Sequence, residues 1–278
     1  MRLFDAHTHL HDARLTPVLD AVIRRAAEAG VTGLCSCGTA PADWADAAAL
    51  AERAGPCRVV TAFGAHPWFA AELPENWPEQ LEAFLLRHAD APVGEIGLDG
   101  VRREIPAALQ EEVFVRQLGL AARLGRPVVL HGARAWEKVL LILKPYAARL
   151  PGILAHGFGG SAEQLARLLE LGGHVSLCGT VCNPEAATVR AVARRVPGER
   201  LLLETDSPDL LPRTGLPAAT DPCGKPLNQP SNLTRVCETV AALRGLDPPR
   251  LAEQTRANAL SFFRCAPNPE DASLRRQA

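Results

Sequence analysis

The segment Asp5-Ala6-His7-Thr8-His9 predicts both a buried strand and a metal site. Apolar residues flank it on both sides, among them Leu3 and Leu10, as is typical of a short strand in a protein core. Successive side chains of a strand point to opposite faces, so His7 and His9 share one face. Two imidazoles on one face, near the end of a strand, can hold one divalent metal ion between them.

Seven further short apolar segments follow, and segments with helical spacing of their apolar residues alternate with them. The predicted strands after the first are residues 33–37, 59–65, 93–98, 127–131, 152–156, 174–178 and 201–206. The predicted helices are residues 18–26, 42–53, 76–88, 113–124, one from about 135, then 162–171, 186–195, 232–243 and 249–263. Nearly continuous apolar strands are typical of parallel sheets, which are covered on both faces.

Eight alternating strand–helix units predict an α/β fold, namely a (β/α)₈ TIM-type barrel, in a single domain. The length of 278 residues fits, because such barrels typically have ~250 residues. A doubly wound open sheet is the alternative, since periodicity does not distinguish a closed sheet from an open one. We expect the barrel to span residues 1–265, with a long loop at 211–229, and residues 266–278 to form a frayed tail.

Composition limits the classes of function. Lys and Arg total 30 and Asp and Glu total 31, giving a net charge of −1. This argues against a protein coated in positive charge for gripping duplex DNA, although bound metal ions could supply positive charge locally. No signal-like segment or stretch of ~18 apolar residues is present, which predicts a cytoplasmic protein without a membrane partner. The eight cysteines are expected to be reduced. The sequence predicts no protein partner.

Metal-competent side chains lie at or near the carboxyl ends of five predicted strands, where α/β barrels build their sites. They are His7, His9, Glu95, His131, His156 and Asp206. Imidazoles mixed with carboxylates suit Zn²⁺, Mn²⁺ or Fe²⁺, and Mg²⁺ where more oxygen ligands take part. Glu95 could bridge two ions, which could activate a water molecule, and Asp206 could take its proton as general base. We therefore predict two divalent ions, with Glu95 and Asp206 as catalytic residues.

Each of these residues also has a simpler interpretation. A single histidine at a strand end is more often a hydrogen-bonded core residue than a ligand. Asp206, which precedes Ser207-Pro208, could cap a helix. The combination favours a metal site, because five strand ends each carry a suitable residue.

Five segments resemble the TatD family of metal-dependent hydrolases. They are Asp5-Ala6-His7-Thr8-His9, Gly94-Glu95-Ile96-Gly97-Leu98-Asp99, Pro127-Val128-Val129-Leu130-His131, His156-Gly157-Phe158-Gly159-Gly160-Ser161 and Glu204-Thr205-Asp206-Ser207-Pro208. The resemblance extends to about Phe263. It implies a barrel of the amidohydrolase kind and a deoxyribonuclease, often a 3′→5′ exonuclease on single-stranded DNA, that uses Mg²⁺ or Mn²⁺. It also implies that the six residues above are the metal ligands.

The sequence departs from the family pattern at a few positions that we expect to shape the substrate pocket. Gly100 replaces an aromatic residue, and Ala133 stands where the family has an arginine, with Arg134 one position later. The other departures are Gly157, Gly159 and Gln229.

Further residues could contact a substrate. His66 could hydrogen-bond a phosphate, and Arg134 could bind one with two hydrogen bonds. Trp68, Phe69 and Trp77 could stack on unpaired bases or simply pack their loop onto the barrel. Asp5 is expected to orient His7 or a backbone group.

Three functions remain open from the sequence. The first is a metal-dependent nuclease acting on DNA or another phosphodiester. The second is a related metallohydrolase acting on a carbonyl ester, a lactone or an aminoacyl bond. The third is a binding protein without turnover, which would predict the loss of a ligand or of the base.

Overall fold

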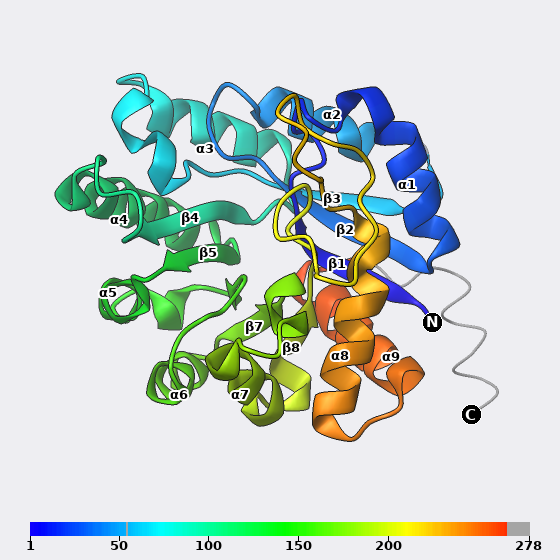
Figure 1. Ribbon diagram of the computed structural model, residues 1–278. Helices are drawn as coiled ribbons and strands as arrows, with labels where there is room; N and C mark the ends of the chain where they lie inside the picture. The colour runs from blue at the N-terminus through cyan, green and yellow to red at the C-terminus, as the bar shows by residue number, and fades with distance from the viewer. Residues whose placement is uncertain (54, 266–278) are drawn as a thin grey trace.

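Eight strands alternate with helices in the computed structural model, which describes residues 1–53 and 55–265 (Figure 1). The strands are β1 Leu3–Thr8, β2 Val31–Cys37, β3 Arg58–Ala62, β4 Val93–Asp99, β5 Val128–Ala133, β6 Ile153–Ala155, β7 His174–Leu177 and β8 Leu201–Leu203. The main helices are α1 Leu19–Glu28, α2 Trp44–Glu52, α3 Trp77–Arg87, α4 Ala107–Leu124, α5 Trp136–Leu143, α6 Ala162–Glu170, α7 Ala187–Arg195, α8 Leu233–Arg244 and α9 Pro248–Phe262.

The strands form a closed parallel barrel. β1–β3 and β4–β8 pair in sequence order, and all of these pairs are parallel. Parallel bridges join the two runs at both seams, between Phe63 and Val93 and between Thr8 and Ser207. At the second seam the His9 amide donates to the Ser207 carbonyl over 2.6 Å. The barrel prediction is therefore confirmed, and the open doubly wound sheet is excluded.

A buried carboxylate strengthens the seam between the first and last strands. Asp5 is fully buried, and its Oδ1 accepts the Thr205 backbone N–H over 2.9 Å. Asp5 Oδ2 lies 2.6 Å from the Thr205 hydroxyl, which in turn contacts the Ser207 hydroxyl at 2.7 Å. Of the two roles expected for Asp5, the structure therefore has the backbone role, and the backbone group is that of Thr205, two residues after β8.

Bulges in β1 and β4 change the face of the strand to which the following side chains point. The four residues from Asp5 to Thr8 lie opposite only three on β2, and the four from Val93 to Ile96 lie opposite three on β5. An extra residue in one strand shifts the alternation of faces locally, and such bulges are common beside active sites. Here the bulges coincide with His7 and Glu95.

The lower interior of the barrel is apolar and is closed by α9. Phe4 of β1 stacks on Phe263 with the ring centroids 5.4 Å apart. Val129, Leu154 and Leu202 belong to the same buried cluster. His131 lies two positions after Val129, and His156 lies two positions after Leu154. The same strand faces therefore carry apolar side chains deep in the barrel and polar side chains at its carboxyl end.

The predicted elements are all present, and the largest boundary difference is at α4. This helix begins at Ala107 rather than at residue 113. The reason is that a buried glutamine occupies an inward position of its first turns, which breaks the apolar pattern. Gln110 is only 3% exposed, and its side chain accepts the Asp99 backbone N–H over 2.8 Å.

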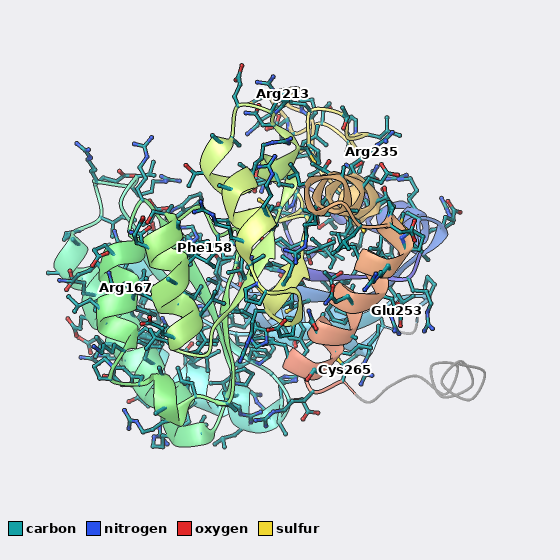
Figure 2. All side chains as sticks on the ribbon, turned by 90° about the horizontal axis from the view of Figure 1, so that it is seen from below. Phe158, Arg167, Arg213, Arg235, Glu253 and Cys265 are labelled. Carbon is teal, nitrogen blue, oxygen red and sulfur yellow. The ribbon has the colours of Figure 1, made fainter. Side chains whose placement is uncertain are left out.

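The loop expected at 211–229 follows β8 and crosses in front of β1–β3 in Figure 1, where it is yellow to orange. Figure 2 shows Arg213 of this loop at the opposite end of the molecule from Cys265, which follows α9. The predicted tail at 266–278 lies outside the described residues, and the domain boundary at 265 stays a prediction. Among the residues described, no helix is both long and apolar enough to span a bilayer. The cytoplasmic location stays a prediction.

We predict that Asp5→Ala lowers the free energy of unfolding by about 3 kcal/mol, because it leaves the Thr205 backbone N–H buried without a partner and removes the carboxylate contact of the Thr205 hydroxyl. Asp20→Ala is a matched control, since Asp20 is 83% exposed on α1, and it should change stability by less than ~0.5 kcal/mol. Urea unfolding followed by circular dichroism measures both variants. Equal stability of the two would contradict the role given to Asp5 in closing the barrel.

Candidate metal centre

The structure brings all six predicted ligands together at the carboxyl end of the barrel. His7 and His9 come from β1 and the residues just after it, Glu95 from β4, and His131 from β5. His156 and Asp206 follow β6 and β8. Their donor atoms form two groups that share Glu95, one around His7 and one around His131.

The first group, here called the His7 group, contains His7, His9, Asp206 and Oε2 of Glu95. The two imidazole Nε2 atoms are 3.2 Å apart. Glu95 Oε2 lies 3.2 Å from His7 Nε2 and 3.4 Å from His9 Nε2. Asp206 Oδ1 lies 3.6 and 3.5 Å from the same two nitrogens. Four donors from three strand ends thus surround one point.

The second group, here called the His131 group, contains His131, His156 and Oε1 of Glu95. Glu95 Oε1 is 2.8 Å from His131 Nδ1 and 2.6 Å from His156 Nε2. The two imidazole nitrogens are 3.3 Å apart. His66 Nε2 lies beside this group, 3.3 Å from Glu95 Oε1.

The donor spacings in both groups fit a small divalent cation. A cation with bonds of about 2.1 Å holds neighbouring donors about 3.0–3.4 Å apart in octahedral or tetrahedral geometry. Most of the separations above lie close to that range. The rings of His7 and His156 also stack with centroids 3.9 Å apart, so protonating both would bring two positive charges into contact. Burial and the charge of His156 lower the pKa of His7, so this imidazole can offer a neutral Nε2 to a cation.

Glu95 is a buried charge at the centre of the site, with a side chain that is 3% exposed. Burial raises the pKa of the Glu95 carboxyl, but the charges of the surrounding histidines, His156 and His66 foremost, lower it more. The net effect places this pKa well below its usual value. Glu95 is therefore an anion whose two oxygens face two different sets of donors.

Neighbouring groups fix the orientation of the imidazoles. The Cys37 carbonyl accepts from His9 Nδ1 over 2.8 Å, which leaves the Nε2 lone pair free for a ligand. Asp99 Oδ2 lies 3.1 Å from His131 Nε2, which directs Nδ1 toward Glu95. Such outer contacts commonly set the tautomer of a metal-binding histidine.

Glu204 supports His156 in a similar way. Its Oε1 lies 3.4 Å from His156 Nδ1, without a hydrogen bond, and accepts the Gly157 backbone N–H over 2.6 Å. Its Oε2 accepts from the Ser176 hydroxyl. Gly157 has a φ of +50°, a conformation that glycine adopts readily, so this departure lets the backbone turn toward Glu204.

His66 is better suited to donate than to bind a metal. Its Nδ1 accepts the Trp68 backbone N–H over 3.2 Å, so the ring proton of the neutral form lies on Nε2. Burial lowers the pKa of His66 to about 4, which keeps the ring neutral at pH 7. The Nε2–H group therefore points into the site beside Glu95 as a hydrogen-bond donor.

Asp206 lies on a tight turn and does not cap a helix. Its φ is +57°, and its carbonyl accepts the Asp209 N–H over 2.9 Å. Arg14 holds this turn, because it bonds Asp209 Oδ2 at 2.8 Å and Asp12 Oδ2 at 2.7 Å. Burial raises the pKa of Asp206, but the hydrogen bond from His9 and nearby imidazole charges lower it further, so the net shift is downward. The alternative of a helix cap is therefore wrong.

Several other residues that could bind a metal or a substrate lie outside the two groups. His11 contacts Ser36 Oγ at 3.2 Å and Asp43 Oδ2 at 3.4 Å. Arg134 has a φ of +50° and is exposed directly after β5. All eight cysteines are free thiols. A Cβ at Gly100 would approach the Arg134 carbonyl oxygen to 3.0 Å, which leaves little room for a larger residue at that departure.

Two acidic residues at the site, Asp99 and Glu204, were missed as supporting groups in the sequence analysis. The sequence does contain a signal for both residues, namely their spacing from predicted ligands. Glu95 and Asp99 are four residues apart on one strand, and Glu204 and Asp206 are two apart at the end of another. Residues at even spacing share a face of a strand.

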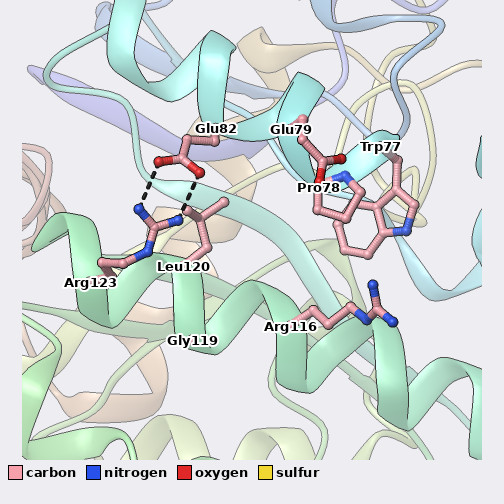
Figure 3. Close-up of a pocket in the computed structure, with 8 residues that line it drawn as sticks. All are labelled: Trp77, Pro78, Glu79, Glu82, Arg116, Gly119, Leu120 and Arg123. Atoms are coloured by element: carbon pink, nitrogen blue, oxygen red, sulfur yellow. Dashed lines mark hydrogen bonds and ion pairs between the residues drawn. The ribbon is translucent and has the colours of Figure 1, made fainter. Parts of the chain in front are cut away.

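A surface hollow with a volume of about 480 Å³ lies elsewhere, between α3 and α4 (Figure 3). Trp77 and Leu120 form part of its wall, and Glu82 forms two ion-pair contacts with Arg123 at one side. None of the six clustered side chains lines it. It is separate from the candidate metal centre.

Comparison with known proteins agrees with this geometry. The family described as TatD related DNase matches residues 4–264. The "3′-5′ ssDNA/RNA exonuclease TatD" of Edwardsiella piscicida is 36% identical over 268 residues, covering 95% of this chain and all of that protein. The protein of the same name from Erwinia billingiae is 36% identical over 267 residues, covering 94% and 99%.

Solved structures give the same result for the fold. A TatD homolog from Escherichia coli superposes with a TM-score of 0.86 at 32% identity, covering 95% of this chain and 99% of that one. A TatD family hydrolase from Entamoeba histolytica superposes with a TM-score of 0.84, covering 94% and 98%, and at 18% identity it supports the fold alone.

We predict that binding of a divalent cation releases protons and strengthens as the pH rises from 6 to 8. Burial lowers the pKa of His9 and of His156, but bonds and charges from nearby carboxylates outweigh it and raise both pKa values well above usual. These imidazoles therefore carry protons near neutral pH that a cation must displace. Calorimetric titration in buffers of different ionisation enthalpy measures the protons released. Binding without proton release at pH 7 would contradict this assignment.

Proposed function

This chain belongs to the TatD-related DNase family, and we propose that it removes nucleotides from the 3′ end of single-stranded DNA with the aid of two divalent cations. The chain is a hydrolase that acts on phosphodiester bonds. The relatives named above act on single-stranded DNA or RNA by their names, and the proposal carries that substrate class to this chain.

One observation carries the proposal: Glu95 presents its two oxygens to two separate donor groups. The His7 group would hold one cation through His7, His9 and Asp206, and the His131 group would hold the other through His131 and His156. When bound, paired cations supply Lewis-acid stabilisation of phosphate oxygens and make water a usable nucleophile near neutral pH. The imidazole-rich set suits Mn²⁺ and Zn²⁺, and the family resemblance implies Mg²⁺ or Mn²⁺.

Asp206 acts as the general base in this proposal. The lowered pKa keeps it ionised at neutral pH, and its side chain is 15% exposed, against 3% for Glu95. Its Oδ1 faces His7 and His9, so the carboxylate lies beside the first group while remaining open to water. It can therefore accept the proton that the attacking water loses.

His66 and Arg134 would hold the substrate phosphate. His66 Nε2–H lies beside Glu95 Oε1 and can donate to an anionic oxygen bound there. Arg134 follows β5 directly after the His131 strand end, and a guanidinium there can form two hydrogen bonds to a phosphate. Replacing either residue by alanine would weaken substrate binding without removing a donor of either group.

We predict that Asp206→Asn keeps the fold and lowers the rate of nucleotide release about 10²–10⁴-fold, the contribution typical of general acid–base catalysis. The assay follows a 3′-labelled single-stranded oligonucleotide with metal-stripped protein to which Mg²⁺, Mn²⁺ and Zn²⁺ are added back separately. Asp20→Asn, at an exposed position of α1 outside both groups, is the control. Wild-type rates in Asp206→Asn would eliminate its role as base, and activity of the wild type only on ester or aminoacyl substrates would overturn the proposed substrate.

We further predict that Glu95→Ala lowers the affinity of the protein for both cations. Asp99→Asn should lower the affinity only for the cation in the His131 group, by about 10–100-fold. The reason is that Glu95 belongs to both groups, whereas His131 is the one member of either group that Asp99 contacts. Equilibrium dialysis with Mn²⁺, followed by elemental analysis, gives occupancy against free metal concentration. Full double occupancy in Glu95→Ala would show that Glu95 does not bridge the two ions.

A further inference from the structure

Trp68 differs from the other tryptophans of the chain because its ring is exposed. Trp44, Trp77 and Trp136 are at most 6% exposed, whereas Trp68 is 41% exposed. Trp68 therefore gains less from burial than the other three tryptophans do. Trp68 lies in the short helical segment Pro67–Glu72, two residues after His66, at the rim of the metal centre.

The exposed ring is nevertheless held in place from two sides. Its Nε1–H donates to Asp99 Oδ2 over 2.6 Å, and its backbone N–H donates to His66 Nδ1 over 3.2 Å. The His66 ring meets it edge-on, with centroids 5.1 Å apart. A ring that is exposed and also held in a fixed orientation is pre-organised to receive a planar group.

Arg102 adds a cation to this ring. Its Cζ lies 4.4 Å from the centroid of the Trp68 ring, within the range of a cation–π contact. Its backbone N–H donates to Asp99 Oδ1 over 3.0 Å, which anchors the residue, while its side chain remains 48% exposed and 3.1 Å from Glu104. Trp68 and Arg102, from the loops after β3 and β4, together form a stacking platform.

Asp99 connects the platform to the metal centre. The same oxygen, Oδ2, contacts Trp68 Nε1 and His131 Nε2, so one atom separates the indole from an imidazole of the His131 group. Both contacts direct a ring N–H at this one carboxylate oxygen, so Asp99 fixes the orientation of both rings. A group stacked on Trp68 therefore lies immediately beside the donors around Glu95.

We propose that Trp68 and Arg102 bind one unpaired nucleobase of the substrate and so position the adjacent phosphate at the metal centre. This inference rests on the proposed function and adds a specificity-determining site to it. Every base has a flat π-face, so stacking accepts all four bases but requires them to be unpaired. The platform thus selects single strands without a positively charged surface, in keeping with the net charge of −1.

The test measures binding rather than turnover, so that it is independent of catalysis. A 5′-fluorescein oligonucleotide is titrated by fluorescence anisotropy with Mn²⁺-loaded protein carrying Asp206→Asn, alone or combined with Trp68→Ala or Trp68→Phe. We expect Trp68→Ala to raise Kd about 5- to 100-fold, the usual range for losing one base–aromatic stack. Trp68→Phe keeps a ring without its N–H and should recover most of the affinity. Leu86→Ala, an exposed apolar residue on α3, is the control and should bind as the parent does.

Abasic substrates distinguish stacking from a merely structural role. Oligonucleotides with an abasic site at one of the three 3′-terminal positions are compared in the same titration. One of these three positions should hold the base that stacks on Trp68. When that base is missing, the oligonucleotide should bind the parent and the Trp68→Ala variant equally. An equal effect of Trp68→Ala on every substrate, or no effect on any, would overturn the platform.

The two proposals can fail separately. If Trp68→Ala and the parent bind alike while the wild type releases nucleotides, the platform is wrong and the nuclease assignment stands. If base-dependent binding is present and the wild type releases no nucleotide with any cation, the platform stands and the proposed hydrolysis of DNA is wrong. Absence of any measurable oligonucleotide binding would overturn the platform as well.

Discussion

The buried carboxylate of Glu95 is the constraint on which the site depends. A carboxylate that is almost excluded from water is stable as an anion only where positive charge or hydrogen-bond donors surround it. Imidazoles from β1, β5 and the loop after β6 meet that need, with His156 Nε2 as close as 2.6 Å. The same arrangement places two sets of lone pairs on either side of one carboxylate, which is the geometry that two bridged cations require. Charge compensation and the proposed chemistry therefore have the same structural origin.

Much of this arrangement could be predicted from the sequence, because the barrel obeys simple periodicity. Eight apolar segments became eight parallel strands, and the carboxyl ends of such strands converge on one face. The metal-competent residues at those ends therefore had to meet once the barrel was closed. Closure itself could not be predicted, since it depends on long-range pairs such as Thr8 with Ser207, and on Asp5 reaching Thr205 across the seam.

The direction in which individual side chains point could not be predicted from the sequence either. Simple alternation along β1 predicts that His7 and His9 share a face, but the bulge between Asp5 and Thr8 alters which face that is. A second bulge does the same at Glu95. Hydrogen-bond partners could not be predicted either, because they depend on the three-dimensional arrangement of the residues. The Trp68 amide decides which nitrogen of His66 carries the proton, and Asp99 links Trp68 to His131 through a single oxygen.

The most direct test of the account is the anomalous scattering of Mn²⁺ in crystals of the metal-loaded protein. The shared carboxylate predicts two peaks, one beside Oε2 of Glu95 among His7, His9 and Asp206, and the other beside Oε1 with His131 and His156. Both should diminish together in crystals of Glu95→Ala. A single peak, or two peaks of which neither contacts Glu95, would contradict the central claim that one buried carboxylate organises both cations.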